Sequence, residues 1–85
     1  MTPRPAARQW QEGAARHIDV RGLAPPEPLV AILRLLQSAP DAGPIVVHHD
    51  RDPQLLYPEL AQLGWQAERV PADAGEVRLL LRRLP

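Results

Sequence analysis

The chain has 85 residues, with ten basic and ten acidic side chains and no cysteine. This length suffices for one modest domain, and the balance of charge gives no general electrostatic reason to expect nucleic acid or an anionic membrane as a partner. The lack of cysteine excludes disulfides, thiolate nucleophiles, iron–sulfur clusters and cysteine-based zinc sites.

The N-terminal residues 1–15 show no clean hydrophobic periodicity, and they contain two early prolines and one tryptophan, Trp10. We therefore predict a flexible N-terminal tail over residues 1–15 and a single domain over residues 16–85. The opening also lacks the apolar stretch of a secretory signal, and no apolar run approaches the ~20 residues of a membrane span. The expected location is the cytoplasm, without a membrane.

A first strand is predicted over Arg16–Val20, where Ile18 and Val20 alternate with polar side chains, as in a strand with one buried face. A proline-rich turn follows, and proline is tolerated in a first helical turn. A helix is therefore predicted over Glu27–Gln37. Its apolar stripe consists of Leu29, Ile32, Leu33 and Leu36.

The β-branched run Ile45–His49 is bounded by turn residues on both sides and predicts a second, interior strand. A turn over Asp50–Pro53 leads to a second helix. Because proline breaks a helix interior, we place this helix at Pro58–Leu63, with Pro58 in its first turn. Gly64 then supplies a left-handed cap.

Two further alternating runs, Trp65–Val70 and Glu76–Arg83, are joined by a turn-rich segment and predict a β-hairpin. The predicted order is β-α-β-α-β-β, in which two crossover units give parallel neighbouring strands and the hairpin adds an antiparallel strand. The predicted fold class is an α/β (α+β) two-layer sandwich. A four-stranded mixed sheet carries two helices on one face and leaves the other face open.

The segment Ile18–Pro28 resembles the opening of the TusA/SirA-like sulfur-carrier family. The hallmark of that family is a Gly-Leu turn followed by Cys-Pro-x-Pro at the start of a helix, and the residues that match are Gly22, Leu23, Pro26 and Pro28. The sulfur-carrying cysteine of the family falls on Pro25, which has no nucleophilic atom. The resemblance therefore implies the scaffold without the persulfide reaction.

A longer stretch, from about Ile18 to Leu84, resembles a cysteine-free sister family of uncharacterised bacterial domains. The resemblance includes Asp50–Pro53 followed by Leu56–Pro58. It implies the TusA/SirA-like β-α-β-α-β-β fold, in agreement with the elements predicted above. It implies little about function, because a fold does not determine a function.

Ligands of open sheets with parallel strands bind beyond the carboxyl ends of the strands. The loops at that rim supply acid, base and guanidinium groups, and the candidate ligand-binding residues are Arg21, Glu27, His49, Asp50, Arg51 and Tyr57. The alternative, which turn chemistry favours, is that residues 50–52 serve only as turn and capping residues. The three prolines at the helix start remove backbone N–H groups and argue against an anion site there.

The three histidines raise the question of a metal site. His48 and His49 are adjacent in a strand, point to opposite faces and cannot chelate one ion together. His17 and His48 share the open face, where with Asp19 they form a weak candidate transition-metal site. The alternative is that they simply cover the solvent side of the sheet.

The open face of the sheet combines apolar and basic side chains, which suits a partner protein or a homodimer. Alternatively, the segment that carries Trp10 folds back over it. The residues expected on this face are His17, Val46, His48, Arg78, Leu80 and Arg82.

The leading functional prediction is a non-catalytic module that binds a protein partner or a small molecule, without a cofactor, because the nucleophile of the related carriers is missing. One alternative is an accessory role in sulfur or redox metabolism. A second is a histidine-based metal or haem binder. A third is an enzyme that uses Glu27, His49 or Asp50 as acid and base, which requires burial to tune their pKa values. Nucleic acid is not expected without a basic patch.

Overall fold

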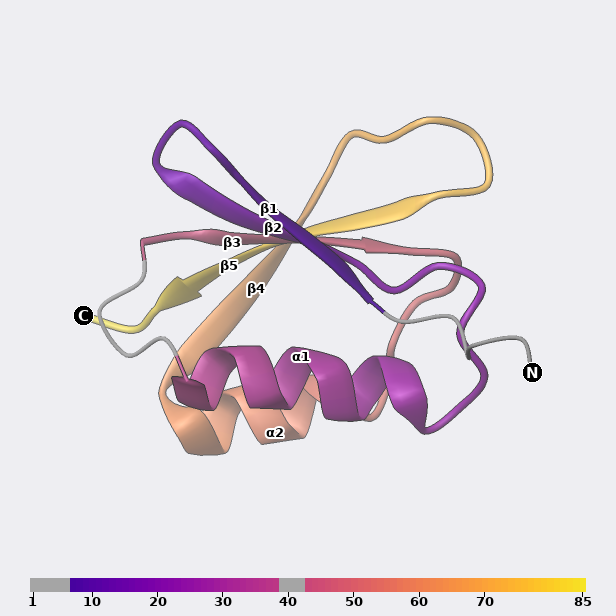
Figure 1. Cartoon of the computed structure of the whole chain (residues 1–85). Helices are drawn as coiled ribbons and strands as arrows, with labels where there is room; N and C mark the ends of the chain where they lie inside the picture. The colour runs from indigo at the N-terminus through magenta and orange to yellow at the C-terminus, as the bar shows by residue number, and fades with distance from the viewer. Residues whose placement is uncertain (1–6, 39–42) are drawn as a thin grey trace.

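The computed structural model describes residues 7–38 and 43–85 as two layers (Figure 1). The helices α1 and α2 lie beneath one face of a sheet, and neither is long and apolar enough to span a membrane. In chain order the elements are β1 (Arg8–Glu12), β2 (Ala15–Asp19), α1 (Glu27–Ser38), β3 (Ile45–His49), α2 (Leu56–Leu63), β4 (Trp65–Val70) and β5 (Val77–Arg83).

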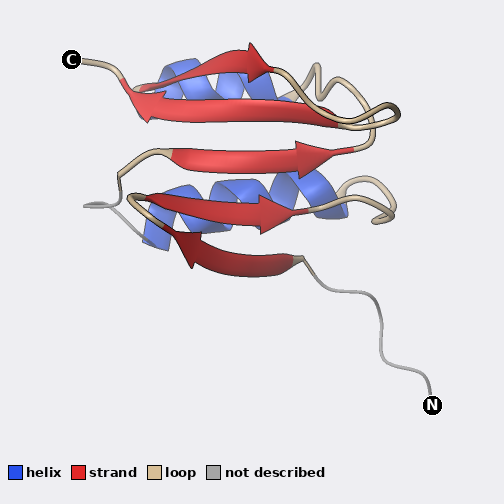
Figure 2. Cartoon of the chain, turned by 90° about the horizontal axis from the view of Figure 1, so that it is seen from above, coloured by secondary structure: helices blue, strands red, loops and turns tan. Residues whose placement is uncertain are grey.

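The strands follow the order β1-β2-β3-β5-β4 across the sheet, which Figure 2 shows from above. Strands β2 and β3 are parallel, and the other neighbouring pairs are antiparallel. Strand β3 is central, as its short apolar run predicted. The two-layer α/β sandwich with a mixed sheet and helices on one face is confirmed.

The described sheet has five strands instead of the predicted four, because residues 8–12 form β1. This strand pairs antiparallel with β2, and Trp10 lies opposite His17. The prediction of a flexible tail is therefore wrong for this segment, and residues 1–6 lie outside the described residues. Trp10 is half-buried while its four strand neighbours are exposed, so no apolar alternation marks the strand in the sequence.

The second crossover also differs from the prediction. After α2 the chain enters β4, but β5 lies between β3 and β4 and is antiparallel to both. Strand β5 buries Val77, Leu79 and Leu81, whereas β4 buries Trp65 alone. The strand with more apolar surface therefore takes the inner position, and the more polar strand forms the edge, where a strand gains least from burial.

Helix α2 begins at Leu56, two residues earlier than predicted. Pro58 is its third residue, and the first backbone N–H groups of a helix have no intrahelical partner in any case, so the proline breaks no hydrogen bond there. The Leu56 side chain is fully buried and anchors the start. Gly64 ends the helix with φ +81° and donates its N–H to Ala61 O, which confirms the predicted left-handed cap.

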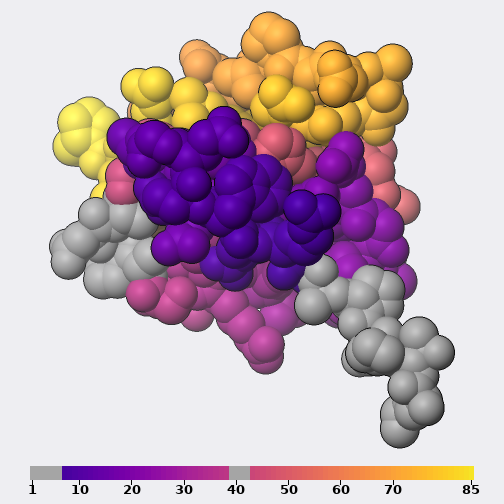
Figure 3. All heavy atoms as spheres, turned by 45° about the horizontal axis from the view of Figure 1, so that its top comes forward, coloured from indigo at the N-terminus to yellow at the C-terminus, as the bar shows by residue number. Residues whose placement is uncertain are grey.

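The core lies between the sheet and the helices and is almost wholly aliphatic. Alternate residues of β2, β3 and β5 point into it, and the helices add their apolar stripes. Its members are Ile18, Val20, Leu23, Ile32, Leu35, Leu36, Ile45, Val47, Leu56, Leu60, Trp65, Val77, Leu79 and Leu81. Strands β1 and β2 form one edge of the sheet, and Figure 3 shows their residues, in indigo and purple, at the front of the molecule.

Candidate functional site

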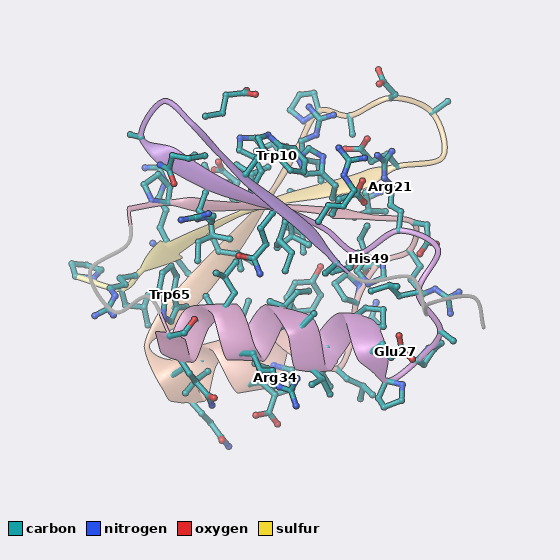
Figure 4. The ribbon with its side chains drawn as sticks, viewed as in Figure 1. Trp10, Arg21, Glu27, Arg34, His49 and Trp65 are labelled. Carbon is teal, nitrogen blue, oxygen red and sulfur yellow. The ribbon has the colours of Figure 1, made fainter. Side chains whose placement is uncertain are left out.

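The six residues predicted to form one rim site are divided between the two faces of the sheet. Arg21 turns to the open face, where its Nε and Nη2 atoms donate to the two carboxylate oxygens of Asp19 at 2.9 and 2.8 Å. Its Nη1 atom donates to Glu76 Oε1 at 3.2 Å. Figure 4 shows Arg21 on one side of the sheet and Glu27, at the start of α1, on the other.

Asp50 joins the two loops at the carboxyl ends of β2 and β3. The backbone N–H of Gly22 donates to Asp50 Oδ2 at 3.1 Å, and this hydrogen bond holds the pKa of the carboxyl below its ordinary value. Arg51 Nε lies 3.6 Å from the other oxygen. These contacts support the turn-and-capping interpretation of residues 50–52.

Tyr57 lies in the first turn of α2 and donates its hydroxyl to Asp52 Oδ1. Burial of the ring, with the Asp52 carboxylate beside it, raises the pKa of Tyr57 to about 12. Gln54 donates to the other oxygen of Asp52 at 2.7 Å. Tyr57 thus fixes the loop before α2 and does not lie beside Arg21.

An apolar groove of about 270 Å³ lies between the N-terminal ends of α1 and α2. Of the predicted rim residues, His49 and Arg51 line it, and so does Pro25, the position of the carriers' cysteine. The sequence did not indicate this groove, because its walls are prolines and leucines from both helix starts. The lining residues are Pro25, Pro26, Pro28, Leu29, Ile32, His49, Arg51, Asp52, Pro53, Gln54, Leu55 and Leu56.

His49 is the buried polar residue of this groove and is only 3% exposed. Its Nδ1 atom accepts the backbone N–H groups of Asp50, at 2.9 Å, and of Arg51, at 3.3 Å. Asp50 Oδ1 also lies 3.1 Å from Nδ1, but a backbone N–H can only donate, so the two amides decide the tautomer. The neutral ring therefore carries its proton on Nε2, the edge away from the loop.

A second cluster lies on the open face. His17 Nδ1 and His48 Nε2 are 2.9 Å apart, which confirms the prediction that these residues meet across neighbouring strands. The ring centroids are 5.2 Å apart, so a direct contact between nitrogens at 2.9 Å means that the rings meet edge to edge. We call these two residues the histidine pair. Trp10 covers both rings, with centroids 5.1 and 5.3 Å away.

Glu76 completes the cluster, although nothing in the sequence singled it out beyond its place at a hairpin turn. Its Oε2 atom lies 3.0 Å from His48 Nδ1 and accepts Arg78 Nε at 2.7 Å. The Arg78 hydrogen bond, together with that of His48, holds the pKa of Glu76 below its ordinary value. The carboxylate oxygen therefore accepts a proton that His48 carries on Nδ1, and His48 Nε2 in turn accepts from His17 Nδ1.

The outer nitrogen of His17 also faces an acid, since Nε2 lies 3.9 Å from Glu12 Oε2. Burial lowers the pKa of His17, and Glu12 opposes that effect. Asp19, the third predicted metal ligand, is instead occupied by Arg21. Among the described residues, no three side chains of the metal-ligating types lie close enough to hold one ion.

The fold is that of a SirA-like α/β domain, and Pro25, where the sequence resemblance places the carriers' cysteine, lines the groove. The chain belongs to the family of uncharacterized conserved proteins DUF2249, whose model matches residues 17–83. It is similar in structure to a SirA-like protein from Desulfitobacterium hafniense. The two are 25% identical with a TM-score of 0.68, and the match covers 81% of this chain and 97% of the other. A comparison with curated proteins finds no match.

Proposed function

We propose that the protein is a non-catalytic binding module, and that the groove between the helix starts takes a small ligand with an apolar body and one hydrogen-bond acceptor. The observation that carries this proposal is the placement of His49. A nearly buried imidazole, whose tautomer is fixed by two backbone amides, lines a mostly apolar groove.

The shape and lining of the groove support a small ligand. Sites for small molecules are concave and mostly apolar, with a few polar groups that fix orientation, and a volume of about 270 Å³ lies near the lower end of their usual range. The prolines at positions 25, 26 and 28 supply no backbone N–H. The Nε2–H of His49 is then the donor best placed to orient a ligand.

Two charged residues line the groove, and Asp52 has both carboxylate oxygens engaged by Gln54 and Tyr57, which leaves the Arg51 guanidinium to attract an acidic acceptor. Arg51 lines the groove with its side chain 63% exposed, and its partner Asp50 is shared with the Gly22 amide. A small aliphatic or aromatic carboxylate fits both groups, because His49 donates to it and Arg51 is attracted to its charge. Catalysis is not proposed, since the acids near His49 are engaged in holding loops and the chain has no thiol.

A second candidate, docking of a partner protein, has its own observation. Leu55 lines the groove and is 74% exposed, so the apolar lining of the groove continues onto the outer surface. In that case an apolar side chain of the partner occupies the groove. An accessory role in sulfur metabolism has only the SirA-like fold in its support, and a fold does not fix a function.

The proposal is tested by titrating isotopically labelled protein with isovalerate and benzoate and following the backbone amides by NMR. We expect saturable shifts at residues 26–32 and 49–56, with no change at the open face. The matched neutral ligands, isovaleramide and benzamide, should bind several-fold more weakly, because they lack the charge that Arg51 attracts. Absence of saturable shifts with every ligand overturns the small-ligand proposal.

Two variants separate the candidates. His49→Asn keeps an acceptor near the position of Nδ1 for the two amides but removes the Nε2–H, and it should weaken carboxylate binding about tenfold. Leu55→Ser leaves the His49 donor intact, so it should change carboxylate binding little while weakening the docking of a partner protein. Loss of carboxylate binding in Leu55→Ser together with full binding in His49→Asn would contradict the role given to His49.

A further inference from the structure

The histidine pair brings two imidazole nitrogens together on the open face of the sheet. The two inner nitrogens, His17 Nδ1 and His48 Nε2, face each other at 2.9 Å, and the rings meet edge to edge with 25° between their planes. A single proton now joins these atoms, since one nitrogen donates and the other accepts. Both lone pairs would otherwise point into the same space.

One outer nitrogen of the pair lies within hydrogen-bond distance of a carboxylate, and the other lies near a second carboxylate. His48 Nδ1 lies 3.0 Å from Glu76 Oε2, and His17 Nε2 lies 3.9 Å from Glu12 Oε2. Histidines that bind metals characteristically donate their second ring N–H to a carboxylate, which fixes the tautomer and strengthens the ligand. Glu76 is itself held by Arg78 and Arg21, so its position is well defined.

We propose that the histidine pair binds one Cu⁺ ion, with His17 Nδ1 and His48 Nε2 as its two ligands, in place of the shared proton. Imidazole nitrogens suit copper. A metal–nitrogen bond is about 2.0 Å long, so a linear two-coordinate ion needs its nitrogens about 4 Å apart. The pair therefore opens by about 1 Å, which small changes of the two side-chain torsions supply.

The surroundings favour a two-coordinate ion over one that needs four ligands. The carboxylate of Asp19 is bound on both oxygens by Arg21, and the described residues offer no third ligand. Trp10 lies over both imidazoles and leaves little room for water ligands on that side. Its indole face also attracts a cation beneath it, so the same residue shields the ion and stabilises it. Figure 4 shows Trp10 on the side of the sheet opposite His49.

The experiment uses Ag⁺, which has the coordination preference of Cu⁺ without its oxidation, in a buffer free of chloride. The chain has no cysteine to compete for the probe. Imidazole nitrogens are observed in long-range ¹H–¹⁵N spectra. We expect one ion per chain, with His17 changing from the Nδ1–H to the Nε2–H tautomer, His48 remaining Nδ1–H, and His49 unchanged as an internal reference.

Any of three results with the native protein would overturn the proposal. They are no response of His17 and His48 to stoichiometric Ag⁺, a response confined to one of them, or tighter binding of Zn²⁺ than of Ag⁺.

The double variant His17→Asn/His48→Gln should lose the response, and binding that survives in it, for example at the thioether of Met1, also contradicts the site. Glu76→Gln keeps both ligands and should weaken binding about tenfold, and its amide spectrum reports folding. The site lies on the face opposite the groove, so its failure leaves the proposed function standing.

Discussion

The indole of Trp10 lies over the imidazole of His17, the residue directly opposite it in the sheet, with 17° between the ring planes. The same indole reaches His48 on β3, so one side chain of the edge strand contacts two neighbouring strands. Arg8 lies over the indole with its guanidinium carbon 5.8 Å from the ring centroid. Trp10 is therefore the residue that fixes β1 to the open face.

Replacement of Trp10 should accordingly destabilise the whole domain. We expect Trp10→Ala to lower the free energy of unfolding by about 2 kcal/mol, because the ring contacts with two imidazoles and the partial burial of the indole are both lost. Urea denaturation measures the effect. Gln9→Ala, in an exposed position of the same strand, is the matched control and should change the free energy by less than about 0.5 kcal/mol. Equal effects in the two variants would show that Trp10 adds nothing specific.

Strand β1 shows where sequence patterns fail. Prediction of β2, β3 and β5 succeeded because their segments carry apolar residues at alternate positions or in a short apolar run. An edge strand on an open face needs neither pattern, and four of the five residues of β1 are exposed. Its pairing comes from the Gly13 turn, at φ +61°, and from Trp10, neither of which has a recognisable period.

The stability of the domain should fall in two steps as the pH is lowered. Burial lowers the folded-state pKa of His17 below its ordinary 6.5, so the unfolded chain binds this proton more readily. The stability contributed by neutral His17 is fully present above pH 6.5 and is lost as the pH falls through the folded-state pKa of this residue. Arg78 and His48 hold the pKa of Glu76 below its ordinary value, and hydrogen bonds from Arg21 and Gly22 lower the pKa values of Asp19 and Asp50, so the contributions of these three carboxylates are lost together at lower pH.

Urea denaturation from about pH 8 to about pH 3 resolves these two steps. His17→Asn should remove the first step and keep the second. Glu12 opposes the effect of burial on His17, so Glu12→Gln should lower the folded-state pKa of His17 further and extend the first step to lower pH. A first step that persists in His17→Asn would assign it to another group.

The candidate site was predicted in part, for reasons that lie in the sheet. Alternation along the strands correctly separated His48 from His49 and joined His48 to His17 across the strands. The rim failed as a single site because the same alternation sends Asp19 and Arg21 to one face and His49 to the other. Glu76 follows the turn between β4 and β5, and only the insertion of β5 beside β3 brings it to His48.

The only tyrosine of the chain offers a direct test of the loop before α2. Burial and the Asp52 carboxylate raise the pKa of Tyr57 to about 12, against an ordinary 10.0, so the phenol should ionise only in strongly alkaline solution. Ultraviolet absorbance of tyrosinate measures this. Asp52→Asn should lower the pKa of Tyr57 only part of the way back to 10.0, since burial is the larger cause of the shift.

The raised pKa of Tyr57 also predicts how the stability of the domain changes at alkaline pH. The folded state keeps the phenolic proton more tightly than the unfolded state, so the contribution of this group is present below 10.0 and is lost as the pH rises toward 12. Tyr57→Phe should remove that alkaline loss. An ordinary titration near 10.0 in the native protein would contradict the contact with Asp52.

The two nitrogens of His49 have separate tasks, and two variants distinguish them. His49→Gln removes the Nδ1 acceptor and leaves the amides of Asp50 and Arg51 without it, which should cost about 1–3 kcal/mol of stability. His49→Asn places an amide oxygen near the position of Nδ1 and should cost less. Chemical denaturation measures which of the two variants has the lower free energy of unfolding. If His49→Asn is the less stable variant, Nδ1 is not the acceptor that orders the loop, and the Nε2–H donor assigned to the groove loses its basis.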